Sequence, residues 1–400
     1  AALAARLSLG VLQNSNMCDF YIGAFCTQSV KKLEPKLRDI LRLGVYQLVF
    51  LDKIPTRAAV NESVALCRRC GLDRAAGLVN AVLRRVGENK NSLPAIPNAG
   101  SAEHLSIKYS HPIWLVDRLI TERGYDFTEA FLRCCNTPPG LDIQVNTLKV
   151  SADDYARALA RSDIAHTLCD FPSGCITLHG GSVTALPGFE EGLFYVQDRA
   201  ARMAVEIAAP MPGMRMLDAC SAPGGKAFSA AVRMENRGSI LACDIHEKKL
   251  ALIRQGAERL GIDIIATETR DARRSDAALE GAFNVVIADV PCSGIGVIRK
   301  KPEIRCKSED EIAGLPAIQR DILANLSRFV KPGGTLLYST CTVLECENEA
   351  VVKGFLESYN DYALEPFTLG AERAESGMRT FFPNTDGTDG FFAAKLKRIK

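Results

Sequence analysis

Residues 214–226 read MRMLDACSAPGGK, and this stretch decides the fold of the carboxyl-terminal half of the chain. A short apolar run passes directly into a loop of small residues that contains Gly224 and Gly225. In an open α/β sheet, glycines after a strand let the backbone approach a ligand at the carboxyl ends of the strands. The loop is not a nucleotide P-loop, because Cys220 stands where that motif needs glycine and Ala227 where it needs serine or threonine.

Three more apolar runs of strand length follow, with segments of helical periodicity between them. They are residues 239–245 (SILACDI), 283–290 (FNVVIADV) and 334–341 (GTLLYSTC). Alternating strands and helices are typical of a doubly wound parallel sheet. We therefore predict a Rossmann-like α/β domain over residues 193–400.

Two acidic residues suggest the ligand of this sheet. Asp244 ends the next strand 24 residues after Cys220, which is about the spacing of an acid that accepts hydrogen bonds from a ribose. Asp271, after a further candidate strand, is placed to receive an adenine amino group. A ligand with an adenosine but no pyrophosphate fits these observations, and S-adenosylmethionine is the commonest one. The alternative is that the glycines only form a turn and Asp244 only caps a helix.

Two cysteines fall at predicted strand ends, on the same side as the glycine loop. Cys292 lies in the sequence Asp289-Val-Pro-Cys-Ser-Gly294, and Cys341 ends the last run. A thiolate that adds to carbon 6 of a pyrimidine makes carbon 5 nucleophilic, and a second thiol nearby could help the later loss of the carbon 5 proton. Asp289 could hydrogen-bond the amide edge of the ring. A buried apolar role is the more common one for a single cysteine.

The amino-terminal region, residues 1–90, has helical periodicity and carries 14 basic against 7 acidic residues. The whole chain has a net charge of only +2, so this basic charge is local. It favours contact with a polyanion, although a solvated helix face is the alternative. Residues 89–102 form a polar linker, and 101–192 are predicted to be a small α+β unit. The basic segment 294–307 is predicted to be a loop along which a phosphate backbone could run.

Composition excludes several classes of protein. Apolar residues make up 47% and charged residues 24% of the 400, which is typical of a folded globular chain. No apolar run is long enough to span a bilayer. Fourteen cysteines fit a reducing, cytoplasmic setting, and the lone Cys67–Cys70 pair without a second pair or a nearby histidine argues against a metal site.

Three ordered motifs, DACSAPGGK (218–226), ADVPCSG (288–294) and YSTCTVLECENE (338–349), resemble those of the Fmu/RsmB (Sun) family. These are bacterial 16S ribosomal RNA cytosine-C5 methyltransferases with a NusB-like amino-terminal domain. The resemblance implies an all-α NusB-like bundle over 1–90, a small α+β linker domain over 101–192 and a class I methyltransferase domain over 193–400. It also implies that the chain begins part-way into the NusB-like bundle, so that this domain is amino-terminally incomplete.

The resemblance assigns roles to individual residues. Cys341 would attack the base, Cys292 would assist release of the methylated base, and Asp289 would orient the cytosine. The S-adenosylmethionine site would be lined by Cys220, Ser221, Ala222, Pro223, Gly224, Gly225, Lys226, Asp244, Asp271 and Asp289.

The implied activity is formation of 5-methylcytidine in 16S ribosomal RNA, of the cytosine-967 type, by a cytoplasmic monomer without a metal ion or a membrane partner. Two alternatives stay open. The same chemistry on transfer RNA uses the same motifs, and an RNA-binding scaffold without activity could keep the same fold.

Overall fold

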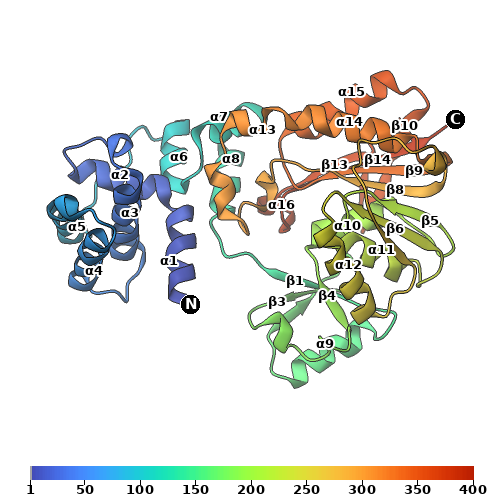
Figure 1. Cartoon of the computed structure of the whole chain (residues 1–400), viewed down its shortest axis with the longest axis horizontal. Helices are drawn as coiled ribbons and strands as arrows, with labels where there is room; N and C mark the ends of the chain where they lie inside the picture. Colours follow the sequence, from blue (N-terminus) through green and yellow to red (C-terminus); the bar gives the residue numbers. More distant parts are fainter. Residues whose placement is uncertain (1) are drawn as a thin grey trace. The chain divides into compact units, whose positions relative to one another are not determined.

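The computed structural model describes residues 2–400 and divides into two compact units (Figure 1). The helical unit contains the chain up to Thr137 together with Ile298–Glu311. The sheet unit contains Pro138–Val297 and Ile312–Lys400. A short helix, α13 (Glu309–Ala313), lies where the chain returns from the helical unit to the sheet unit.

The main sheet of the sheet unit has the strand order β10-β14-β9-β8-β5-β6-β7, and β13 pairs with β14. Strands β5 to β9 form parallel pairs with one another, as predicted. Strands β10, β13 and β14 extend the sheet beyond β9 with antiparallel pairs. The order reverses at β5, whose neighbours are β6 and β8, so ligand binding is favoured there. The strands are β5 (Arg215–Asp218), β6 (Ser239–Asp244), β7 (Ile265–Thr269), β8 (Phe283–Asp289), β9 (Val330–Thr340), β10 (Tyr362–Leu364), β13 (Met378–Phe381) and β14 (Phe391–Arg398).

Helices cover both faces of this sheet, because successive side chains of a strand point to opposite faces. Met216 packs with α10, α11 and α12 in one core, while its neighbour Leu217 packs with α14 and α15 in the other. Figure 1 shows these two helix groups on opposite sides of the strands. The predicted doubly wound fold is therefore confirmed. The helices are α10 (Arg199–Ala208), α11 (Gly225–Arg233), α12 (Glu247–Leu260), α14 (Leu315–Ser327), α15 (Glu349–Ser358) and α16 (Pro383–Asp386).

The sheet unit also contains a smaller antiparallel sheet of order β2-β3-β1-β4. Tyr155 and Leu159 of α9 (Ala152–Arg161) pack against Ile143, Ile176 and Phe194 of its strands. The predicted strand over 141–145 is confirmed as β1. The strands are β1 (Leu141–Val145), β2 (His166–Leu168), β3 (Cys175–Leu178) and β4 (Phe194–Val196), and a separate pair is formed by β11 (Phe367–Leu369) and β12 (Glu372–Ala374).

The helical unit is built from amphipathic helices around one core, as the periodicity of residues 1–90 predicts. Leu37, Leu41 and Val45 of α3 and Val79 and Val86 of α5 are all buried in it. The helices are α1 (Ala2–Gln13), α2 (Ser15–Phe25), α3 (Pro35–Phe50), α4 (Thr56–Arg69), α5 (Ala76–Glu88), α6 (Ala102–Tyr109), α7 (Ile113–Arg123) and α8 (Tyr125–Cys134).

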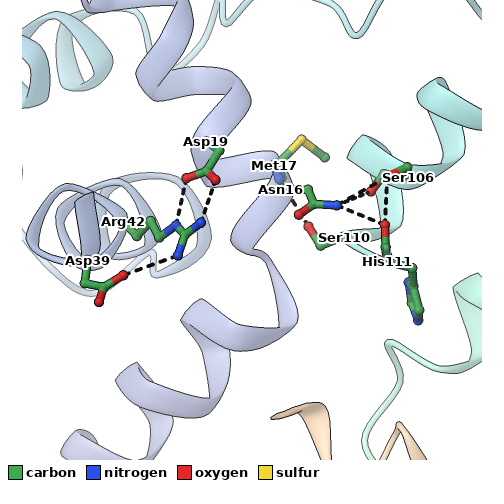
Figure 2. Close-up of polar contacts among 8 residues, drawn as sticks. All are labelled: Asn16, Met17, Asp19, Asp39, Arg42, Ser106, Ser110 and His111. Carbon is green, nitrogen blue, oxygen red and sulfur yellow. Dashed lines mark hydrogen bonds and ion pairs between the residues drawn. The ribbon is translucent and has the colours of Figure 1, made fainter. Parts of the chain in front are cut away.

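Polar contacts join α2 to α6 and to the two residues that follow it (Figure 2). The Asn16 side chain donates hydrogen bonds to the Ser106 carbonyl, 3.2 Å, and to the His111 carbonyl, 2.9 Å. The Met17 amide donates to Ser110 Oγ, 3.1 Å. Helices α6 to α8 thus pack with the amino-terminal helices, and this compact unit extends beyond the predicted linker at 89–102.

The basic segment 294–307 differs from its prediction as an open loop that follows a phosphate backbone. It forms two short 3-10 helices, Ile295–Val297 and Pro302–Cys306, and its second part packs into the helical unit. Arg305 is only 6% exposed and donates to the Gln13 carbonyl, 2.6 Å, the Cys135 carbonyl, 3.1 Å, and Asn136 Oδ1, 2.6 Å. Arg305 therefore satisfies carbonyls of the helical unit and is not available to a phosphate.

Candidate active site

The loop between β5 and α11 turns back on itself beneath the carboxyl ends of the strands. The Ser221 amide donates to the Cys243 carbonyl on β6, 2.7 Å, and the Gly224 amide donates to the Ser221 carbonyl, 2.7 Å. Gly224 has a φ of +108°, a region that favours glycine, and α11 begins at the next residue. The sequence therefore needs its glycine at the point where the loop enters the helix.

A cavity of about 430 Å³ opens at the edge of the sheet between this loop and the ends of β6, β7 and β8. Five of the predicted cofactor residues line it, namely Cys220, Ala222, Asp244, Asp271 and Asp289. Sequence reasoning missed its apolar walls, which include Ile245, Pro291, Ile318 and Ile322, and its polar residues His246, Lys249, Arg270 and Arg273. An apolar pocket with a few convergent polar groups is typical of a small-molecule site.

The two acids predicted to hold an adenosine have different surroundings. Asp244 Oδ1 accepts the His246 amide, 2.9 Å, at the end of β6. Asp271 is held by the Arg273 guanidinium at 3.0 and 2.7 Å, and this ion pair with the Arg273 amide lowers the pKa of Asp271 to about 2. Both carboxyl groups line the same cavity, but the Asp271 oxygens already accept hydrogen bonds from Arg273.

A second cavity of about 200 Å³ lies on the other side of the loop and is lined by Ser221, Pro223, Gly225 and Lys226. It also contains Asp218, which the sequence did not single out. Asp218 is fully buried near the Ser221 hydroxyl, yet neither carboxylate oxygen accepts a hydrogen bond of ordinary geometry from residues 2–400. Burial raises the pKa of Asp218 to about 7, and the positive charge of Lys226 opposes that rise.

Lys226 connects the glycine loop to the predicted base-binding residue. Its Nζ lies 2.6 Å from Asp289 Oδ2, and Ser339 Oγ donates to Asp289 Oδ1, 2.8 Å. The Lys226 charge also interacts with Asp218 and with Cys341. One buried cation therefore serves two carboxylates and a cysteine, an arrangement that favours the thiolate form of that cysteine.

The two predicted catalytic cysteines meet. Cys292 follows β8, Cys341 follows β9, and their Sγ atoms lie 3.2 Å apart as free thiols. The hydrogen bond to Cys341, together with burial, raises the pKa of the Cys292 thiol well above its ordinary value. Either sulfur can be the donor in this contact, and the raised pKa makes Cys292 a thiol that keeps its proton at neutral pH.

Residues of the motif YSTCTVLECENE hold the Cys292 loop in place. Glu347 is fully buried and accepts hydrogen bonds from the Ser293 amide and from Gln319 Nε2, both 2.9 Å. Gln319 also donates to the Pro291 carbonyl, 3.0 Å, and Ser293 Oγ donates to Thr342 Oγ1, 2.8 Å. Sequence reasoning missed Glu347 and Gln319, because only the motif containing Glu347, and not its contact with residue 293, is visible in the sequence.

Residues 2–400 carry neither a metal-binding cluster nor a membrane-spanning helix. No group of three or more histidine, cysteine or acidic side chains there is arranged to hold a metal ion. None of the helices there combines the length and the apolar composition that a bilayer-spanning segment needs.

Sheet, cavity and paired thiols together define an S-adenosylmethionine-dependent methyltransferase. The family described as 16S rRNA methyltransferase RsmB/F matches residues 205–397, the NusB family matches residues 1–88, and the RsmF/B-like ferredoxin-like domain matches residues 111–184. The chain belongs to the RsmB/F methyltransferase family, which confirms the resemblance seen in its motifs.

Individual relatives agree with this assignment. The chain is 34% identical over 407 residues to a probable ribosomal RNA small subunit methyltransferase B of Bacillus subtilis, with 99% of this chain and 90% of that protein covered. The crystal structure of PH0851 has a TM-score of 0.85 at 27% identity and covers 99% of this chain and 89% of that one. NSun6 from Pyrococcus horikoshii, solved with the S-adenosylmethionine analogue SFG, shares the fold with a TM-score of 0.65 at 20% identity, over 71% of this chain and 97% of that one.

Proposed function

We propose that this protein methylates carbon 5 of a cytosine in small-subunit ribosomal RNA, at a site of the cytosine-967 type. The observation that carries the proposal is the 3.2 Å contact between the Cys292 and Cys341 sulfurs at the edge of the sheet that also holds Asp289. Methyl transfer to oxygen or to an exocyclic nitrogen has no use for two facing thiols. Methylation of pyrimidine carbon 5 needs a nucleophile and then a base.

The residues around the two cavities fit S-adenosylmethionine. Asp244 and Asp271 offer carboxylates to a ribose and an adenine, and Ile245 and Ile318 offer apolar walls to the purine. The unsatisfied Asp218 carboxylate and Ser221 hydroxyl suit the charged amino-acid end. When bound, S-adenosylmethionine supplies an electrophilic methyl group.

In this proposal Cys341 attacks the base. Its sulfur forms a bond to carbon 6 of the cytosine, and the electron pair of the carbon 5–carbon 6 double bond moves so that carbon 5 becomes nucleophilic. The nearby charge of Lys226 and the thiol proton of Cys292 favour the thiolate that starts this step. Asp289 accepts a hydrogen bond from the exocyclic amine and orients the ring.

Cys292 then acts as the base that completes the reaction. The hydrogen bond to Cys341 is the largest cause of its raised pKa, and that cause disappears once the Cys341 sulfur is bonded to carbon 6. Cys292 can then give its thiol proton to water and, as a thiolate, take the proton of carbon 5. The electron pair restores the double bond, the carbon–sulfur bond breaks, and Cys341 leaves as a thiolate.

The RNA partner is supported by charge and by the relatives. Residues 1–90 carry 14 basic against 7 acidic residues, and phosphate neutralisation gives affinity that does not depend on sequence. The Bacillus subtilis relative is named as a ribosomal RNA small subunit enzyme, which favours ribosomal over transfer RNA. We further propose that the protein acts in the cytoplasm, as a monomer and without a metal ion.

The substrate test compares unmodified 16S ribosomal RNA, a transfer RNA pool and double-stranded DNA with labelled S-adenosylmethionine, followed by nucleoside analysis. We expect label as 5-methylcytidine in the ribosomal RNA, and none with Cys341→Ser. The matched control Cys70→Ser changes an exposed cysteine of the helical unit and should keep full activity. Label in transfer RNA alone would overturn the substrate, and label in a nucleoside other than 5-methylcytidine would overturn the chemistry.

A further inference from the structure

A second pair of cysteines faces each other in the small sheet. Strands β2 and β3 are antiparallel, with Leu168 opposite Ile176, so that Cys169 and Cys175 stand opposite each other one position further. The Cys169 amide donates to the Cys175 carbonyl, 2.9 Å. Directly opposite residues have Cα atoms about 4.5–5.5 Å apart, which lies within the separation that a disulfide can bridge.

Both cysteines are free, and as directly opposite residues of the ladder they place their side chains on the same face of the sheet, but their surroundings differ. Cys175 is fully buried, whereas Cys169 is half-buried, with its Sγ 3.5 Å from the Thr177 hydroxyl. The hydrogen bond from Cys175 lowers the pKa of Cys169 to about 6, and the contact with Thr177 and the charge of Arg199 act in the same direction. That same hydrogen bond, together with burial, raises the pKa of Cys175. Cys169 is therefore the more accessible and the more readily ionised of the two thiols, and the buried Cys175 is the one that keeps its proton.

We propose that Cys169 and Cys175 form a redox-active thiol pair that a peroxide converts into a disulfide. An accessible thiolate with a second thiol in contact is the arrangement that oxidation-sensitive cysteines share. The pair lies outside both cavities described above, so this inference does not depend on the proposed methylation chemistry.

The reaction has two balanced steps. The Cys169 thiolate attacks one oxygen of hydrogen peroxide, the oxygen–oxygen bond breaks, and the leaving hydroxide takes a proton to become water. Cys169 is then a sulfenic acid, oxidised by two electrons. The Cys175 sulfur loses its proton and attacks the Cys169 sulfur, the sulfur–oxygen bond breaks, and a second water leaves as the disulfide forms.

The test uses the full chain, reduced and then treated with a small excess of hydrogen peroxide before alkylation, trypsin digestion and mass spectrometry. Cleavage after Arg161 and Arg199 releases residues 162–199, which contain only these two cysteines. We expect this peptide to lose the mass of two hydrogens and to take up no alkyl group. The proposal is overturned if it stays reduced at a peroxide dose that oxidises the exposed Cys70 and Cys306.

Variants test the order of the two steps. In Cys175→Ser, a dimedone adduct should appear on Cys169, whereas Cys169→Ser should leave Cys175 unmodified. The matched control Cys134→Ser, which changes another half-buried cysteine, should form the hairpin disulfide as the unaltered chain does.

Alkylation kinetics give an independent readout in the unaltered protein. At pH 6.5, we expect Cys169 to react with iodoacetamide about fivefold faster than Cys70, because a larger thiolate fraction outweighs the lower intrinsic nucleophilicity of a low-pKa thiol. A faster reaction at Cys70 would contradict the assignment of Cys169 as the anionic thiol.

Discussion

The Nζ atom of Lys226 lies 2.6 Å from Oδ2 of Asp289, and this ion pair ties the glycine loop after β5 to the end of β8. Both side chains are largely buried, with exposed fractions of 12% and 26%. The Lys226 charge also interacts with Asp218 and Cys341, so one cation is shared by the glycine loop, the carboxylate proposed to orient the base and the sulfur proposed to attack it. The cofactor side and the base side of the proposed site are thus joined by one residue.

Lys226→Met should lower the free energy of unfolding by about 2–4 kcal/mol, because it leaves the Asp289 carboxylate buried without its cation. Adding Asp289→Asn to that variant should recover part of the loss, since the unpaired charge is then removed. Urea unfolding measures both effects, and the exposed Lys248→Met is the matched control. Equal free energies of unfolding for Lys226→Met and the unaltered chain would show that the Lys226–Asp289 ion pair does not stabilise the fold.

Asp218→Asn tests the buried carboxyl group. The pKa of Asp218 is raised to about 7 from an unfolded value near 3.9, so its contribution to stability is fully present below about pH 4 and is lost as the pH rises through 7. The asparagine variant does not ionise and should therefore gain stability relative to the unaltered chain between pH 5 and pH 8, on the order of 2–3 kcal/mol. Its affinity for S-adenosylmethionine should fall.

Thermal unfolding at the two pH values measures this difference, with the exposed Asp310→Asn as control. A stability difference that does not change with pH would mean that Asp218 is not the group that titrates near neutrality.

Glu347→Gln tests how the Cys292 loop is held. The variant keeps the size of the side chain but places an amide group where the carboxylate accepts from Ser293 and Gln319. Hydrogen bonds to a charged group contribute about 1.5–3 kcal/mol, so we expect kcat to fall about tenfold or more while the KM for S-adenosylmethionine stays within twofold. Glu345→Gln in the same segment is the matched control. A change in KM alone would place the effect of Glu347 on the cofactor instead.

Asn16→Ala tests the contact between α2 and α6 shown in Figure 2. The variant removes the hydrogen bonds to the Ser106 and His111 carbonyls and should destabilise the helical unit by about 1–2 kcal/mol. Asn14→Ala is the matched control, because the Asn14 side chain donates to the Gly10 carbonyl one turn earlier and not to α6. Thermal unfolding should show a lower transition for Asn16→Ala than for Asn14→Ala.

Local patterns were sufficient to predict the parallel sheet and the position of its ligand edge. Asp244 and Asp289 are the last residues of their strands and the glycine loop comes directly after β5, and such short-range signals are visible in the sequence. Strand β14, by contrast, pairs antiparallel with β9, and Phe392 lies opposite Thr340 although it comes 52 positions later in the chain. The apolar sequence of β14 alone does not predict which strand it pairs with or in which direction it runs.

The prediction for the basic segment 294–307 was wrong for the same reason, because its contacts are with residues far away in the sequence. Arg305 was predicted to follow a phosphate backbone because its neighbours are basic, yet its partners are carbonyls at Gln13 and Cys135. The buried surroundings of Asp218 and the hydrogen-bond partners of Glu347 are likewise set by tertiary packing. Charge runs and motifs identify residue types, but only the folded chain shows which of their polar atoms are already satisfied.

The most direct test of the central claim is covalent trapping on 16S ribosomal RNA that contains 5-fluorocytidine, read as protein–RNA adducts on a denaturing gel. Fluorine at carbon 5 cannot leave as a proton, so the unaltered protein should accumulate an adduct in the presence of S-adenosylmethionine. On ordinary RNA, Cys292→Ser should accumulate an adduct and Cys341→Ser should form none. An adduct with Cys341→Ser and none with Cys292→Ser would show that the two thiols have the opposite roles, and no adduct with the unaltered protein on 5-fluorocytidine RNA would contradict covalent catalysis.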